Sequence, residues 1–573
     1  MSKKLGAVAM AALAIASIYY GGSYFTAGDT SLAEHPATQL KAMTAADDHG
    51  YNLAAQRAKI ARLDLKADTS FLSDEEKQVI NKLIGAAAYM SEIYLRQRSE
   101  ENPAVRAEIA ASDAPNKALL LDMFDLHFGP WDTLEESHPF YGDKAMPAGA
   151  AFYPGDMTKE EFEAWITAHP EDKEAFTSLY TVIRRDGDKL IAIPYRDHYS
   201  EWLVPAAQLL REAAEITSNP SLKDFLSKRA TSFLTDEYFE SELAWMDLKD
   251  TPIEIAIGPY EVYTDGLYGY KTAYEAFVTI KNPEESAALG RYKDYLREME
   301  ANLPVAENYK NFKRGFESPI AATYQIRGGG DNVPGVQTIA FNLPNDERVR
   351  EAKGAKKVLL NNVLEAKFKL ILAPMAEYIL TAEQAPMLVG KYMSMETLFH
   401  ELSHSLGPGT ITVDGRETTV NAEFKELASA IEEGKADAMG VYNILFMMEK
   451  GELPKAERDS MLATYFVGLF RSMRFGIDEA HGRGSAFQYS YLKKNSAFTV
   501  DAKTGLYSLD FDKVEATVTE IVRDVVMMQG DGQYAAAKTF LDTYAVLDDA
   551  ANASFDRTSG IPVDIQPVYP EKL

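Results

Sequence analysis

The chain has 573 residues, of which 46% are hydrophobic and 25% are charged, and its formal net charge is −27. This length exceeds what one compact core organises, so at least two domains or lobes are expected, and the composition excludes wholesale disorder. The negative charge would repel polyphosphate and argues against nucleic acid as a partner. There is no cysteine, which excludes disulfides, thiolate metal sites and thiol nucleophiles, so any metal must be held by histidine and carboxylate groups.

The N-terminus predicts export. Lys3 and Lys4 precede an apolar run that extends from Leu5 to about Tyr20. This pattern is typical of a secretory signal, and the alternative is an uncleaved anchor. We therefore expect residues 1–28 to be a signal peptide or N-terminal anchor. The protein would be periplasmic and would contact a membrane only through such an anchor.

Helical and strand patterns alternate in the amino-terminal half. Acidic residues followed by apolar residues at helical spacing predict a long helix, and Thr158 with Glu161 has the form of a capping box that opens a second one. Asp186-Gly187 between two β-favouring runs predicts a hairpin. The other expected elements in this half are helices over 73–97, 199–216 and 221–247 and a strand over 253–265.

The carboxy-terminal half is mainly helical by the same criteria, so the fold class is α+β and predominantly helical. We expect a mixed α/β lobe over 36–280 and a mainly helical, metal-binding lobe over 281–540. Residues 325–370 are Gly-rich and then extended, and we expect them to return to the first lobe. Residues 541–573 are expected to form a C-terminal tail.

A candidate metal site lies in the segment His400-Glu401-Leu402-Ser403-His404. Residues four apart share one face of a helix, so both imidazoles can reach one ion, and Glu401 can reach a water molecule beside it. An apolar stripe flanks the motif, and a Gly-Pro-Gly run ends the helix after His404. The alternative is a pair of satisfied core histidines, although burying two histidines without a partner is costly.

Catalytic zinc needs a third protein ligand and an open position for water. The candidates are His481 and downstream carboxylates, of which Glu433 and Asp437 are the strongest. They lie one turn apart beside an apolar helical stripe over 424–446. Small residues such as Gly440 next to them would let another helix approach. The alternative is a solvated acidic helix surface.

The run HELSHSLGPG followed by EEGKAD resembles the dipeptidyl peptidase III family of zinc metallopeptidases. The resemblance implies one Zn²⁺ per chain with Glu433 as the third ligand, and Glu432 and Asp437 as partners that orient the imidazoles. It also implies two lobes with an active-site cleft between them and the zinc on the helical lobe. Typical members have one more residue between the two histidines, and the shorter spacing resembles bacterial proteins and plant Nudix-fused homologues.

Three further segments resemble the same family. GPYEVYTDGLYGYKTAYEAF contains Tyr263 beside Glu261, FNLPNDERVREAKGAKKVLLNNVL contains Asn342 and Asn345, and AHGRGSAFQ contains His481. The resemblance implies that Tyr263 and His481 stabilise the transition state and that the two asparagines line the substrate cleft. Because an exopeptidase must fix the free amine of its substrate, Glu261 is our candidate for that role.

The function that this resemblance implies is hydrolysis of peptides. Glu401 would act as general base on a zinc-bound water, and dipeptides would be released from peptide N-termini. One alternative is a zinc hydrolase that acts on another amide or ester. Another is an exported peptide-binding protein with a vestigial metal site, which would show no turnover sensitive to chelators.

Overall fold

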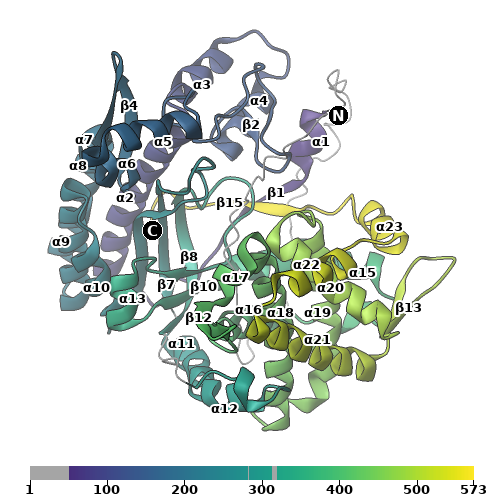
Figure 1. Ribbon diagram of the computed structural model, residues 1–573. Coiled ribbons are helices and arrows are strands. Elements are labelled where there is room, and N and C mark those ends of the chain that lie inside the picture. Colours follow the sequence, from purple (N-terminus) through teal and green to yellow (C-terminus); the bar gives the residue numbers. More distant parts are fainter. Residues whose placement is uncertain (1–50, 282, 313–318) are drawn as a thin grey trace.

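The structure is a computed structural model that describes residues 51–281, 283–312 and 319–573. The predicted signal peptide or anchor over 1–28 lies outside these residues. The chain forms two lobes, one built on a β-sheet and one built almost entirely of helices (Figure 1). This arrangement confirms the predicted α+β, predominantly helical class. In the described part of the chain, no helix has the length and hydropathy needed to cross a membrane.

The first lobe contains a five-stranded sheet. The strand order is β6-β7-β8-β10-β9, in which only β8 and β10 run parallel. Residues 325–370 therefore place β9, β10 and the second half of β8 in the same sheet as β6 and β7. The bounds of these strands are β6 (Ile253–Glu261), β7 (Ala273–Lys281), β8 (Ile320–Gly330), β9 (Ala340–Leu343) and β10 (Lys356–Leu360).

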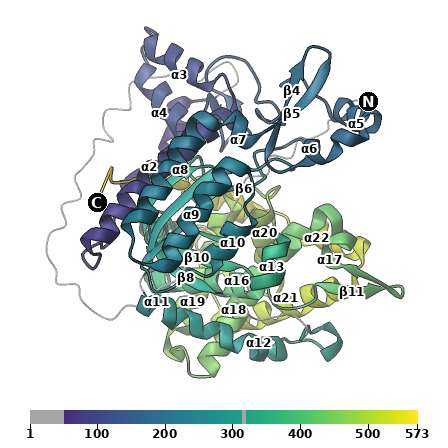
Figure 2. The ribbon, with the colours of Figure 1, turned by 90° about the vertical axis from the view of Figure 1, so that its left-hand side faces the viewer.

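Helices cover the sheet. Helix α2 packs on β7 and β8, α8 packs on α2, and α9 packs on α8, so that together they form an outer layer (Figure 2). The helices of this lobe are α1 (Leu53–Ala58), α2 (Asp74–Arg98), α3 (Asn102–Ala111), α4 (Lys117–His127), α5 (Lys159–Ala168), α6 (Lys173–Thr177), α7 (Tyr195–His198), α8 (Ser200–Ile216), α9 (Pro220–Thr235), α10 (Phe239–Met246) and α13 (Glu347–Lys353). Its short strands are β1 (Ile60–Asp64), β2 (Trp131–Asp132), β3 (His138–Pro139), β4 (Thr181–Asp186) and β5 (Lys189–Pro194).

The second lobe is helical. Helices α11 (Pro283–Gly290) and α12 (Leu296–Asn302) lead into it. Its remaining helices are α14 (Asn361–Lys367), α15 (Ala373–Ile379), α16 (Gly390–Ser403), α17 (Val420–Phe424), α18 (Ala428–Glu449), α19 (Arg458–Met473), α20 (Ala480–Lys494), α21 (Phe511–Asp531), α22 (Tyr534–Tyr544) and α23 (Asp549–Arg557). Its strands are β11 (Thr410–Val413), β12 (Arg416–Thr419), β13 (Phe498–Val500), β14 (Tyr507–Leu509) and β15 (Asp564–Val568).

Local sequence explains the clearest of these elements. Ser73 and Glu76 form a reciprocal capping box that opens α2. At the start of α5, where a capping box was predicted, the Thr158 hydroxyl accepts the backbone N–H of Glu161. The predicted hairpin is also confirmed, because β4 and β5 pair with Asp186 opposite Lys189 and Gly187 adopts a φ of +60° in the turn.

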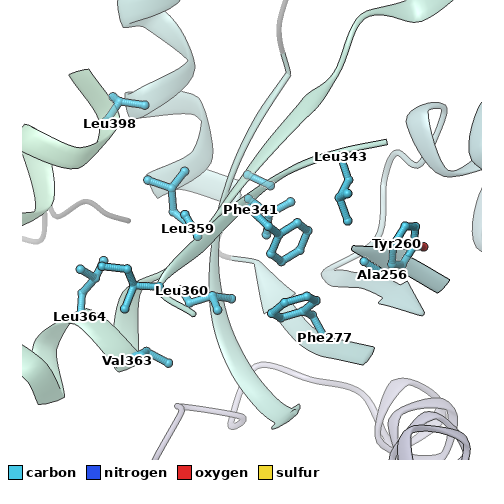
Figure 3. Packing of buried hydrophobic residues seen from close by; sticks show 14 of the residues in the cluster. Ala256, Tyr260, Phe277, Phe341, Leu343, Leu359, Leu360, Val363, Leu364 and Leu398 are labelled. Carbon is cyan, nitrogen blue, oxygen red and sulfur yellow. The ribbon is translucent and has the colours of Figure 1, made fainter. Parts of the chain in front are cut away.

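The core of the sheet continues into the helical lobe. The rings of Phe277 on β7 and Phe341 on β9 stack with centroids 4.2 Å apart (Figure 3). Leu359 on β10 and Leu398 on α16 belong to the same cluster of buried residues. The helix that carries both motif histidines is therefore packed into the core that it shares with the sheet.

Three predictions from the sequence were wrong in detail. The helix expected over 221–247 is divided into α9 and α10, because Asp236 adopts a left-handed φ of +61° and its carboxylate accepts the backbone N–H of Arg196. The stripe over 424–446 is divided at Lys425, where φ is +53°. Residues 541–573 are no loose tail, since they complete α22, form α23 and end in β15, which pairs in parallel with β1.

Candidate metal centre

Two helices carry the candidate ligands, and they lie unusually close together. His400 and His404 are on α16 or at its C-terminus, and Glu433 is on α18. A Cβ atom placed on Gly440 of α18 would lie only 2.9 Å from the backbone N of His400 and 3.1 Å from the backbone O of Glu396. Only glycine permits this approach, so the predicted role of the small residue at Gly440 is confirmed.

The three candidate ligand atoms converge on one point. His400 Nε2 lies 3.0 Å from His404 Nε2 and 3.2 Å from Glu433 Oε2, and His404 Nε2 lies 3.6 Å from the same oxygen. Ligand atoms that surround a tetrahedral ion with bonds of about 2.0–2.1 Å, as zinc forms, lie about 3.3 Å apart. The geometry of the three side chains therefore fits such an ion without rearrangement.

Carboxylates at the back of both rings fix the tautomers. Asp437 Oδ1 lies 2.6 Å from His400 Nδ1, and Glu432 Oε1 lies 2.8 Å from His404 Nδ1. With Nδ1–H donated to a carboxylate, a neutral imidazole carries its lone pair on Nε2. Glu433 Oε2 is a buried oxygen with no hydrogen bond to the described residues. It faces the lone pairs of both imidazoles, and this arrangement favours a cation between the three atoms.

The charges around this point are strongly coupled. Burial alone would raise the pKa of Glu433, but the imidazoles of His481, His404 and His400 outweigh it and lower that pKa to about 2. Burial likewise opposes a proton on His400, yet Asp437 and Glu433 raise the pKa of this imidazole well above its usual value. A cation would replace that proton, so metal binding is expected to release protons.

The carboxylate of Glu432, which contacts His404 Nδ1, has two further partners. Lys435 Nζ lies 2.8 Å from Glu432 Oε1, and Gln529 donates to the other oxygen at 2.8 Å. Burial opposes ionisation of Glu432, but Lys435 and His404 lower the pKa of its carboxyl well below the usual range. Glu432 is therefore held in place by two partners besides His404, although its side chain, like that of Asp437, is only partly buried.

Two further predicted residues reach the same centre. Glu401 follows His400 on α16 and is 7% exposed, and its carboxylate accepts no hydrogen bond from the described residues, so it is available to a water molecule. His481 Nδ1 lies 3.5 Å from Glu433 Oε2. His481 lies in the first turn of α20, where Gly484 allows close contact with α18.

The other predicted residues lie on the sheet lobe. Asn345 Nδ2 donates to Glu261 Oε1 at 3.2 Å, so the structure brings these two together. Tyr263 is 45% exposed, and burial of the rest of the side chain, with the charges of Glu261 and Glu433, raises the pKa of its hydroxyl. The influence of Glu433 places Tyr263 within electrostatic reach of the candidate metal ligands. Asn342 lies on β9 with a buried, unpartnered Oδ1 among the described residues.

Two acidic residues were missed by sequence reasoning. Glu275 lies opposite Gly330 on the neighbouring strand, Asp331 follows that glycine, and Glu261 ends β6, so three carboxylates gather at one end of three adjacent strands. Burial, with the charges of Glu261 and Asp331, raises the pKa of Glu275 well above its usual value. The only available signal was a glutamate within the buried strand pattern AYEAF, a position where a charge is costly.

Known proteins share this fold. The model of peptidase family M49 matches residues 156–413. A solved structure named DPP III from Caldithrix abyssi superimposes with a TM-score of 0.89 at 48% identity, covering 90% of this chain and 98% of that one. The dipeptidyl-peptidase III from Corallococcus sp. strain EGB gives 0.79 at 39% identity, covering 90% and 96%. Fold and site together therefore define a two-lobed metallopeptidase.

Sequence relatives agree. A plant protein named Nudix hydrolase 3, from Arabidopsis thaliana, is 34% identical over 91% of this chain and 74% of its own length. The dipeptidyl peptidase 3 of Nematostella vectensis is 26% identical over 62% of this chain and 55% of its own length. The chain thus spans about half the length of that animal relative. It belongs to peptidase family M49, the dipeptidyl peptidase III family, as the sequence motifs predicted.

Proposed function

We propose that this metallopeptidase uses one zinc ion and releases dipeptides from the free N-termini of peptides. The observation that carries the proposal is the convergence of His400 Nε2, His404 Nε2 and Glu433 Oε2 at distances of 3.0–3.6 Å, which match a tetrahedral zinc site with one open position. The names of the two solved structures support the dipeptide specificity.

The chain's own residues divide the chemistry. A bound zinc ion supplies a Lewis acid that activates water and polarises the scissile carbonyl. Glu401 takes a proton from the attacking water and passes it to the leaving amine. Tyr263 and His481 approach from the two lobes and donate hydrogen bonds to the developing oxyanion, each worth a few kcal/mol as a rough magnitude.

The carboxylates on the sheet lobe suit the free amine. Glu261, with Asn345 bound to it, lies beside Glu275 and Asp331, and no lysine or arginine forms an ion pair within 4.0 Å of these carboxylates in the described residues. An ammonium group would relieve their mutual repulsion. This acidic end favours a peptide with a free N-terminus over a general amide or ester. Asn342 on β9, whose Oδ1 has no hydrogen bond among the described residues, is available to the peptide backbone.

The test is the variant Glu401→Gln, assayed on dipeptidyl arylamides with free and acetylated N-termini. We expect the variant to keep about one metal ion per chain while turnover falls by about 10²–10⁴-fold, the usual contribution of a general base. The wild-type protein should cleave only the free-amine substrates and should lose activity to a chelator. Retained turnover in Glu401→Gln would overturn the role of this residue, and cleavage of acetylated substrates would overturn the dipeptide specificity.

We also propose export of the chain. The support is the sequence pattern of Lys3 and Lys4 before an apolar run that reaches about Tyr20. Cell fractionation with N-terminal sequencing distinguishes a cleaved signal from a retained anchor, and cytoplasmic recovery of an unprocessed chain would contradict both.

A further inference from the structure

A small cavity lies beside the metal centre within the helical lobe. Its volume is about 100 Å³, room for several water molecules, and its walls come mainly from α16, α18, α19 and α20. His400 and Asp437 line it on one side, His481 lines it as well, and Ile339 reaches it from the sheet lobe. The cavity is therefore adjacent to the reaction centre, yet the proposed chemistry does not use it.

A half-buried arginine faces this cavity with two of its donors buried. Arg471 on α19 lines it, and both Nε and Nη2 of this guanidinium are buried without a hydrogen-bond partner among the described residues. No carboxylate of those residues forms an ion pair with Arg471. A donor removed from water is costly unless it is satisfied, so Nε and Nη2 need an acceptor, and no hydrogen bond of the described residues supplies one.

Asp564, the acid whose charge acts on Arg471, cannot meet that need. Asp564 is fully buried and already accepts from Lys367, whose Nζ lies 2.8 Å away, and from the backbone N–H groups of Gln337 and Ile565. Arg474 is a third cation near this point, and it donates to the backbone carbonyl of Ile561. Arg471 thus lies within electrostatic range of two other cations, Lys367 and Arg474, in a protein whose overall charge is −27.

The pKa values agree with this excess of positive charge. Burial, together with the charge of Arg471, lowers the pKa of Lys367 to about 8 and that of Arg474 to about 10. Asp564 acts in the opposite direction on Lys367 and is outweighed. An anion at Arg471 would relieve the repulsion among all three groups.

The rest of the cavity shows where such an anion would bind. Glu396 on α16 also faces the cavity with a buried, unpartnered Oε1, and it lies beside Gly468, three residues before Arg471 on α19. A negative group is repelled from the end near Asp437, whose Oδ1 lies 2.6 Å from His400 Nδ1. The end near Arg471 and Phe475, whose ring lies 5.5 Å from the guanidinium carbon, remains for it.

We propose that Arg471 binds a small anionic group in this cavity, a carboxylate or a halide ion, through the paired Nε and Nη2 donors. This fork matches both oxygens of a carboxylate and can also hold a single halide. The anion has two possible sources. It is either an inorganic halide or the C-terminal carboxylate of a short peptide whose N-terminus lies at Glu261, and the second source rests on the proposed function.

Peptides of increasing length identify the second source. Tripeptides to hexapeptides are assayed as free acids and as C-terminal amides with the wild-type protein, Arg471→Gln and the control Arg471→Lys, which keeps the charge. At one length, the wild-type kcat/KM should favour the acid by about ten- to a hundredfold, mainly through KM, as expected for a charged hydrogen-bond pair. Arg471→Gln should bring the ratio to about one, and Arg471→Lys should restore part of it.

Bromide identifies the first source without any turnover. At constant ionic strength set with the sodium salt of HEPES, a bulky sulfonate without a carboxylate, bromide should raise the thermal unfolding midpoint of the wild-type protein in a saturable way, and the rise should vanish in Arg471→Gln. If that variant does not fold, anomalous scattering from bromide at Arg471 in wild-type crystals decides the question. A peptide acid-to-amide ratio of about one at every length, with no bromide effect, overturns the proposal. If no peptide is cleaved but bromide stabilises the wild-type protein and not Arg471→Gln, only the proposed function is overturned.

Discussion

Replacing Gly440 by alanine tests whether the contact between α16 and α18 sets the metal geometry. The added Cβ would lie 2.9 Å from His400 N, 3.1 Å from Glu396 O and 3.2 Å from Phe399 C. All three are backbone atoms, so no side chain can rotate away to make room. Ordinary contact begins at 3.4 Å, which leaves a shortfall of 0.5 Å (3.4 minus 2.9 Å) that the two helices must absorb by moving apart.

The ligands are divided between these helices, so the separation is transmitted to the metal centre. A movement of 0.5 Å exceeds the tolerance of about 0.2 Å in metal–ligand distances. Overpacking of this kind costs about 1–3 kcal/mol. If the metal centre bears that cost, zinc affinity falls by about 5- to 150-fold.

The assay is a zinc titration against a competing chelator, with thermal unfolding measured for the metal-free and metal-loaded forms. The matched control is Gly290→Ala on α11, where a new Cβ meets nothing within 4 Å and the variant should match the wild type. Zinc affinity that stays unchanged in Gly440→Ala, while the metal-free protein loses stability, would refute the reasoning, because the strain would then be absorbed away from the ligands.

Two further predictions concern single carboxylates. Asp437→Asn keeps the shape of the side chain but removes the charge 2.6 Å from His400 Nδ1, so zinc affinity should fall by about 10- to 100-fold; an unchanged affinity in the same titration would contradict the role of Asp437. Burial raises the pKa of Asp236 to about 6 in the folded protein, above the value of about 3.9 in the unfolded chain. Between these two pH values only the folded state holds the proton, so the free energy of unfolding falls as the pH rises from about 4 to about 6. Asparagine tolerates the left-handed φ, so Asp236→Asn should match the stability of the wild type near pH 4 and exceed it above pH 6 by at most about 3 kcal/mol. Urea unfolding at several pH values measures this difference, and a difference that does not change with pH would contradict the prediction.

The metal ligands were predictable because their constraints are local. His400 and His404 are one helical turn apart, and the spacing alone places both rings on one face. The choice of Glu433 over Asp437 was different, because both lie on the same turn of α18. The family resemblance indicated Glu433, and only the packing of α18 on α16 shows Asp437 behind His400 at Nδ1 and Glu433 in front at Nε2.

The parts that sequence reasoning missed depend on distant contacts. Asp236 ends α9 because the backbone of Arg196, forty residues earlier, donates to its carboxylate. Glu275 joins Glu261 and Asp331 only because β6, β7 and β8 pair in a particular register. Neither interaction leaves a periodic pattern in the local sequence, since each is decided by tertiary structure.

The pairing of β15 with β1 has a consequence for how the molecule is made. Ile60 lies opposite Asp564, so a strand synthesised early remains without its partner until almost all of the described chain has been synthesised. Asp564 also forms an ion pair with Lys367 of the helical lobe, so the same late segment links both lobes. The last step of folding would therefore join the sheet lobe to the helical lobe, and a chain truncated before this strand would expose the first strand's edge to other molecules.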